Sequence, residues 1–289
     1  RKGLQLQKKL GVNPFKFGMI GSTDAHTSLA AVEEENFFGK HSGVEPGPER
    51  YKHPMAETPA GKYESWDMVS SGLAAVWARD NTRDAIFDAM QRKETYGTTG
   101  PRILVRFFGG WDFGEEDTKA RLPATIGYTK GVPMGGDLPE IPEGKDAPTF
   151  LVAALKDPLS GNLDRIQIVK GWVEDGERQE KVYDVAWGDA DERKPDEDGK
   201  LPPVGNTVNV EEATWTNTIG DPELITVWKD PDFDPSQRAV YYARVIEIPT
   251  PRWTAYDAKR YAVDMPADAE MVTRERAYTS PIWYTPKEE

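Results

Sequence analysis

The second half of the chain carries seven short runs of β-branched and aromatic residues with no helical pattern between them. Such residues favour extended backbone that packs on at least one face. Pairs such as Asp175-Gly176 and Asp230-Pro231 separate the runs and are typical of tight turns. This succession predicts an antiparallel β-sandwich over residues 103–289. The runs cover residues 103–108, 149–155, 164–172, 182–187, 224–228, 239–248 and 278–284.

The first part of the chain, residues 1–102, has a different character. Leucines and lysines in residues 1–10, followed by Gly11, predict a helix that stops at the glycine. The apolar residues 15–20 predict a short strand directly after it. Helix, glycine and strand form one half of a β/α repeat, so we expect an α/β unit here and a domain boundary near residue 102. Residues 81–94 predict a further helix, with Asn81 as its cap.

Composition narrows the classes of partner. The 36 basic and 49 acidic residues give a net charge of −13, which argues against general nucleic-acid binding. There is no cysteine, so thiol chemistry and disulfides within the chain are excluded. No apolar run approaches the ~20 residues of a membrane span. The chain begins at Arg1 rather than methionine, and we therefore expect sequence upstream of it.

The residues that follow the predicted short strand are the strongest candidates for chemistry. The segment GSTDAH, residues 21–26, places Asp24 and His26 two positions apart. In extended backbone such residues point to the same side. A carboxylate and an imidazole are a common ligand pair for Zn, Mn or Fe. The alternative is a polar turn with a solvated histidine.

Two other patterns occur in the second half of the chain. The alternating aspartates 230–234 resemble the start of a calcium loop, but Pro235 and Tyr241 occupy the positions of its glycine and glutamate, which excludes an EF-hand. The many tryptophans and tyrosines fit either a sandwich core or a sugar-binding platform, and we favour the core.

Several long motifs, spread over almost the whole chain, resemble those of the domain of unknown function 3604 family. The GSTDAH segment is similar to the last metal-binding motif of the PHP (polymerase and histidinol phosphatase) superfamily, in which that family is placed. The other matching stretches are NFFGKHSGVEP at 36–46, YGTTGPRI at 96–103, RIQIVKGW at 165–172, EIPTPRW at 247–253 and YTSPIWY at 278–284.

The resemblance implies the C-terminal part of a PHP-like distorted β/α barrel in residues 1–102, followed by the β-sandwich in residues 103–289. It also implies two or three divalent metal ions, with Asp24 and His26 as ligands. The first PHP motif, an H-x-H, is absent. The remaining ligands would therefore come from a missing N-terminal part of the same protein.

The implied activity is hydrolysis of a phosphoester or related ester bond by a metal-activated water, on a small anionic substrate. Lys40, His41 and Arg102 lie in the loop and turn that flank the motif, and we expect them to neutralise substrate charge. The rival interpretation is a non-catalytic module whose sandwich recognises a polymer or a protein partner. Relatives often look exported, so the resemblance is compatible with a periplasmic or extracellular location.

Overall fold

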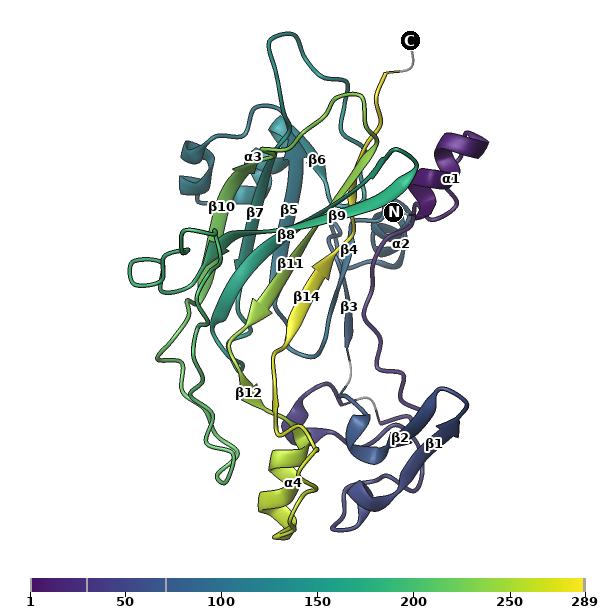
Figure 1. Cartoon of the computed structure of the whole chain (residues 1–289), viewed down its shortest axis with the longest axis vertical. Helices are drawn as coiled ribbons and strands as arrows, with labels where there is room; N and C mark the ends of the chain where they lie inside the picture. Colours follow the sequence, from purple (N-terminus) through teal and green to yellow (C-terminus); the bar gives the residue numbers. More distant parts are fainter. Residues whose placement is uncertain (1, 30, 71, 288–289) are drawn as a thin grey trace.

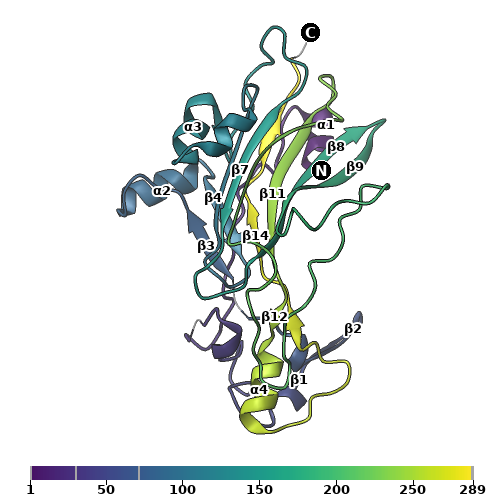
Figure 2. The ribbon, with the colours of Figure 1, turned by 90° about the vertical axis from the view of Figure 1, so that its left-hand side faces the viewer.

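The protein has a large two-sheet body and a small lobe at one end of it (Figure 1). The computed structural model describes residues 2–29, 31–70 and 72–287. A view turned by 90° shows the two sheets as adjacent layers, with the small lobe below them (Figure 2).

The body consists of antiparallel strand pairs arranged in two sheets. One sheet has four strands in the order β10-β7-β5-β6, and the other has seven in the order β3-β4-β14-β11-β8-β9, with β15 also paired to β11. The strands are β3 (Leu73–Val76), β4 (Thr95–Thr98), β5 (Leu104–Gly110), β6 (Gly131–Pro133), β7 (Thr149–Leu155), β8 (Leu163–Glu174), β9 (Glu177–Trp187), β10 (Glu223–Lys229), β11 (Ala239–Glu247), β14 (Arg276–Thr279) and β15 (Ile282–Tyr284).

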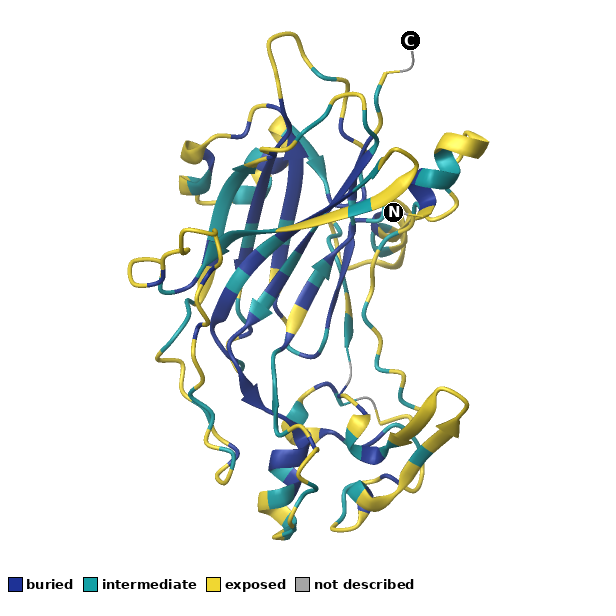
Figure 3. Ribbon diagram, viewed as in Figure 1, coloured by how far each residue is buried: buried dark blue, intermediate teal, exposed yellow. Residues whose placement is uncertain are grey.

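Side chains from the two facing sheets form one continuous apolar core (Figure 3). Phe150 of β7 and Tyr241 of β11 meet in this core with ring centroids 4.6 Å apart, and both are fully buried. Fully buried and partly buried positions alternate along most of β11, as expected when every second side chain points toward the core. Of the aromatic residues predicted to fill the core, Tyr241 and Tyr284 are buried in it, and Trp172 and Trp228 pack against it.

Helices lie around the body and do not alternate regularly with the strands. Leu4 of α1 (Lys2–Leu10) packs on Val240 and Trp283, while α2 (Arg83–Gln91) and α3 (Pro123–Lys130) lie beside β3, β5 and β6 (Figure 2). The α2 helix is capped by Thr82, whose hydroxyl accepts a hydrogen bond from the Ala85 amide, and not by Asn81. No helix in the described residues is long and apolar enough to cross a bilayer.

The small lobe is assembled from two distant parts of the sequence. Phe37, Val44 and Met68 from the first part pack against Trp253 from the second. The lobe contains η1 (Glu34–Asn36), η2 (Arg50–Lys52), β1 (Pro54–Thr58), β2 (Gly61–Glu64), η3 (Ser65–Asp67), β12 (Thr250–Pro251), α4 (Trp253–Tyr261) and β13 (Val272–Thr273); η4 (Glu115–Lys119) belongs to the body.

The expected β/α barrel is wrong. The sheets are antiparallel, helices are few, and the described residues contain no closed barrel. Residues 15–20 form no strand; they run as an extended segment across β4. The segment and β4 lie so close together that a Cβ added to Gly97 would be only 2.5 Å from the Gly21 nitrogen. The segment approaches the sheet through its glycines Gly18 and Gly21, while Phe15, Phe17, Met19 and Ile20 are exposed.

The strand predictions for the second half are confirmed at the level of individual elements, although the last predicted run forms two strands, β14 and β15. Strands β3 and β4, from the first part of the chain, pair within the seven-stranded sheet, and β4 contacts β14 directly. The body is thus completed by residues that precede position 102.

Candidate functional site

The Asp24 loop lies where the extended N-terminal segment leaves the body and reaches the small lobe (Figure 1). The Ser22 carbonyl accepts a hydrogen bond from the Gly72 amide at 3.0 Å, which fixes the entry to the loop. Asp24 then adopts a left-handed backbone with φ of 49°, a conformation that aspartate tolerates better than most residues. The side chains of Asp24 and His26 are both exposed and are therefore accessible to a ligand.

Lys40 holds this loop from two sides. Its ammonium group donates a hydrogen bond to the Thr23 carbonyl, and its own carbonyl accepts one from the His26 amide, each at 2.6 Å. Partial burial lowers the pKa of Lys40, while the carboxylates of Asp24 and Glu34 oppose that effect. The structure thus brings Lys40 together with Asp24 and His26, the predicted metal ligands.

His41 and Arg102 are directed elsewhere. The His41 ring contacts the Ser42 carbonyl at 2.9 Å through Nδ1 and the Met55 sulfur at 3.1 Å through Nε2. Arg102 is exposed, and its guanidinium lies 3.5 Å from a Glu33 carboxylate oxygen. Of the three predicted catalytic residues, Lys40 adjoins the Asp24 loop, while His41 contacts Ser42 and Met55, and Arg102 contacts Glu33.

Arg102 lines a polar cleft between the body and the small lobe, which we call the junction cleft. The cleft encloses about 180 Å³. Its walls come from η1, from the turns that precede β5 and follow β7, and from β12 and α4. The lining residues are Val32, Glu33, Glu34, Glu35, Pro101, Arg102, Asp157, Leu159, Ser160, Trp215, Thr250, Pro251, Tyr256 and Glu275.

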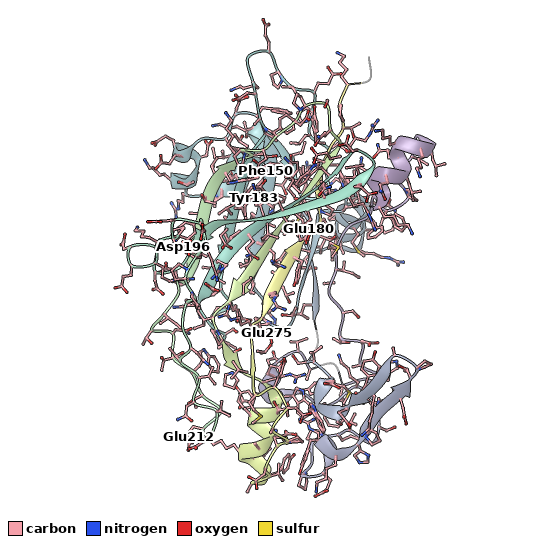
Figure 4. All side chains as sticks on the ribbon, viewed as in Figure 1. Phe150, Glu180, Tyr183, Asp196, Glu212 and Glu275 are labelled. Atoms are coloured by element: carbon pink, nitrogen blue, oxygen red, sulfur yellow. The ribbon has the colours of Figure 1, made fainter. Side chains whose placement is uncertain are left out.

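Two buried glutamates lie at the body side of this cleft. Glu275, just before β14, is only 5% exposed and accepts a hydrogen bond from the Thr99 hydroxyl (Figure 4). Burial, reinforced by the Glu34 carboxylate, raises the pKa of Glu275 to about 8. Glu247 is fully buried and receives the Ser160 hydroxyl at 2.7 Å; burial likewise raises its pKa to about 8. Both carboxyl groups therefore carry a proton at neutral pH.

The sequence predicts two metal ligands, Asp24 and His26, and both lie in the described part of the chain. Asp24 and His26 offer a hard oxygen and an imidazole nitrogen, a donor set that suits Zn, Mn or Fe. Within residues 2–29, 31–70 and 72–287, no group of three or more acidic or histidine side chains is arranged to hold a metal ion. A complete coordination shell would need donors from outside the described residues.

A wider cavity of about 1020 Å³ is lined by residues of α2, of α3 and of the segment that follows β3. Its floor is an ion-pair network in which Glu94 contacts Arg92 and Arg106, and the Arg106 guanidinium stacks 3.2 Å above the Trp77 ring centroid. These groups satisfy one another, and none of the residues predicted for chemistry lines this cavity. We therefore place the candidate site at the Asp24 loop and the junction cleft.

The fold and this junction define a two-sheet β-sandwich protein with a small lobe and a polar cleft between the two. The chain belongs to the DUF3604 family, a family of proteins of unknown function, whose profile matches residues 1–286. No curated protein and no solved structure is significantly similar to the chain.

Sequence reasoning missed the partly or fully buried carboxyl groups in and beside the cleft. Glu34 stands in a run of three glutamates that looks like a solvated loop, yet it accepts hydrogen bonds from the Ser70 hydroxyl and the Trp253 amide. Glu247 lies near the end of the predicted strand 239–248, and Glu275 lies three residues before the predicted strand 278–284. Only the apolar residues around both positions could have indicated burial.

Proposed function

We propose that the chain forms part of a metal-dependent hydrolase that acts on phosphoester or related ester bonds. Asp24 and His26 would hold a divalent ion, as the resembling motif does in PHP hydrolases. The observation that supports this role is the loop geometry: both side chains are exposed, and Lys40 fixes the backbone on either side of them. When bound, such an ion supplies an acidified water as the nucleophile.

Lys40 has two roles in this proposal. Its hydrogen bond to the Thr23 carbonyl keeps the loop in one conformation, so it is a positioning residue for Asp24 and His26. The Asp24 carboxylate acts electrostatically on its ammonium group, which could also neutralise charge on an anionic ester. Arg102 and His41 would contribute only through the junction cleft and the β1 side of the lobe, respectively.

The missing ligands imply a further protein segment, from upstream in the same protein or from a separate chain. An exposed apolar strip supports a partner on this side of the molecule. Phe15, Phe17, Met19 and Ile20 are each at least 39% exposed along the extended segment that leads to the Asp24 loop. Large apolar side chains clustered in this way mark surfaces that another protein part covers.

Ester hydrolysis tests the proposal against its rival, a sandwich that serves only as a binding module. In the full-length protein, we expect hydrolysis of a phosphate, sulfate or carboxyl p-nitrophenyl ester with Mn or Zn, abolished by a chelator. Asp24→Ala should lower the rate about 100-fold or more, because a lost ligand removes both the ion and its bound water. Absence of turnover on all three esters, with the protein folded, would favour the binding module.

A further inference from the structure

The small lobe holds a histidine and a methionine in direct contact. Met55, in β1, packs against the apolar core of the lobe (Figure 1). Its sulfur atom lies 3.1 Å from Nε2 of His41, which belongs to the loop that follows Lys40. Both side chains are partly exposed. Neighbouring groups therefore fix the pair, and a small solute can still reach it from the solvent.

A hydrogen bond on the other side of the imidazole ring determines which nitrogen carries the proton. Nδ1 of His41 lies 2.9 Å from the Ser42 carbonyl oxygen, which can only accept. Nδ1 is therefore the donor, and in the neutral ring Nε2 presents a lone pair. The thioether sulfur of Met55 is also an acceptor. Two lone pairs thus face each other at 3.1 Å, and the contact becomes favourable when a positive ion lies between them.

The arrangement around His41 is the usual one for a metal ligand. A histidine that binds a metal through one ring nitrogen commonly donates the other ring N–H to a carbonyl or carboxylate, which fixes the orientation of the ring. The Ser42 carbonyl has this role for His41. A thioether sulfur is a soft ligand and favours Cu(I) over the hard ions that oxygen donors prefer.

The charge and the composition of the surroundings fit a soft monovalent cation. The Glu45 carboxylate accepts a hydrogen bond from the Gly43 amide at 2.6 Å and is attracted electrostatically to both His41 and His53. In the described part of the chain, no three histidine or acidic side chains are arranged to hold a metal ion, so a hard divalent ion would lack a full coordination shell here. Cu(I), with its filled d shell, is stable with only a few donors.

We propose that His41 and Met55 form a binding site for Cu(I), with Nε2 and the sulfur as the protein ligands. Metal–nitrogen and metal–sulfur bonds are about 2.0 and 2.3 Å long, so the two atoms must separate by roughly 0.5–1 Å to admit the ion. The unbranched methionine side chain has the rotational freedom for this movement. The site is independent of the proposed hydrolase, because it uses neither Asp24 nor His26.

Methyl NMR of the full chain, with isotope-labelled methionine methyl groups, tests the proposal. Ag(I) is an air-stable probe with the charge and softness of Cu(I). In chloride-free buffer, an equimolar amount of Ag(I) should shift the Met55 methyl resonance, which the Met55→Leu variant assigns. The matched control is Met90 of α2, which is 51% exposed and should keep its resonance position. Equal shifts at both residues would show that Ag(I) binds any accessible thioether and would overturn the proposal.

Competition for Cu(I) against bicinchoninate, under anaerobic reducing conditions, measures the affinity. Met55→Leu and His41→Ala should each weaken Cu(I) binding at least about tenfold, because the loss of a ligand costs at least as much as the loss of an outer-shell partner. Met90→Leu should bind Cu(I) as the wild type does. Unchanged affinity in either of the first two variants, with the fold intact, would overturn the proposal.

The wild-type protein also separates an ion from a proton between the two side chains. A Met55 methyl resonance that moves on acidification but not on addition of Ag(I) would mean that only the imidazolium form satisfies the sulfur, and the proposal would be wrong. Ester hydrolysis is not a readout in these experiments, so a negative result here leaves the proposed hydrolase untouched.

Discussion

Replacement of Arg50 by alanine is expected to destabilise the small lobe by about 3–5 kcal/mol, the usual cost of breaking a buried ion pair from one side. The Arg50 guanidinium binds both oxygens of Asp257 and donates a third hydrogen bond to the Phe37 carbonyl at 2.8 Å. It also lies 4.5 Å from the Trp253 ring centroid. Both members of the pair are at most 4% exposed.

The large effect follows from the group that the substitution leaves behind. Burial raises the pKa of Asp257 even in the presence of Arg50, so the carboxylate depends on the guanidinium for its charge. Without Arg50, α4 would lose its link to η2, and Asp257 would have to take up a proton or reach water. Hydrogen exchange of the α4 amides and Trp253 fluorescence during urea unfolding measure this change.

The matched control is Lys52→Ala in the same η2 turn. Lys52 and Glu49 form an ion pair 2.7 Å long, but their side chains are 55% and 67% exposed. Exposed pairs contribute about 0–1 kcal/mol, so this variant should resemble the wild-type protein. A loss of less than 1 kcal/mol in Arg50→Ala would contradict the account of how the lobe is held together.

The second large effect is a dependence of stability on pH caused by Glu247. Its pKa is raised from 4.5 to about 8 in the folded protein, so the folded state binds the proton more tightly than the unfolded chain. The stability that this proton contributes is fully present below pH 4.5 and is lost as the pH rises through 8. At about 1.4 kcal/mol per unit of pKa, the loss is on the order of 4 to 5 kcal/mol.

Glu247→Gln mimics the protonated carboxyl group and should remove this dependence. The free energy of unfolding, measured in urea at pH 5 and at pH 8.5, should fall more steeply with pH in the wild type than in the variant. The difference between the two pH values is the readout, because the glutamine amide adds a constant cost beside the unpartnered Oε1 position. Glu192→Gln, on an exposed loop, serves as control. Parallel pH profiles in wild type and Glu247→Gln would show that Glu247 titrates normally.

Most strands of the body could be predicted because their own residues favour extended backbone. Runs such as residues 164–172 and 239–248 are long, β-branched and aromatic, and tight turns bound them. By contrast, β3 has the sequence LAAV, with a single β-branched residue, and β4 is only four residues long and is interrupted by Gly97. They are strands because β4 pairs with β14, β3 pairs with β4, and the extended N-terminal segment lies against them, which is a tertiary effect.

The residues of the candidate site also differ in whether local sequence could predict them. Asp24, His26 and Lys40 could be proposed from short motifs, since all three lie within one stretch of chain. The junction cleft could not, because it depends on Glu34 meeting Glu275 and on Arg50 meeting Asp257 from opposite ends of the sequence. A single sequence holds no local pattern that reports such contacts. The barrel was expected from a family resemblance and from one helix–strand pair, too little sequence to determine a fold.

The metal content of the purified full-length protein tests most directly whether Asp24 and His26 hold a divalent ion. We predict that Asp24→Ala and His26→Ala each lower bound Zn, Mn or Fe about tenfold or more by elemental analysis. His53→Ala and Asp191→Ala replace exposed residues of the same types elsewhere and should keep the wild-type content. Wild-type metal content in both of the first two variants, with the fold intact, would contradict the proposed site.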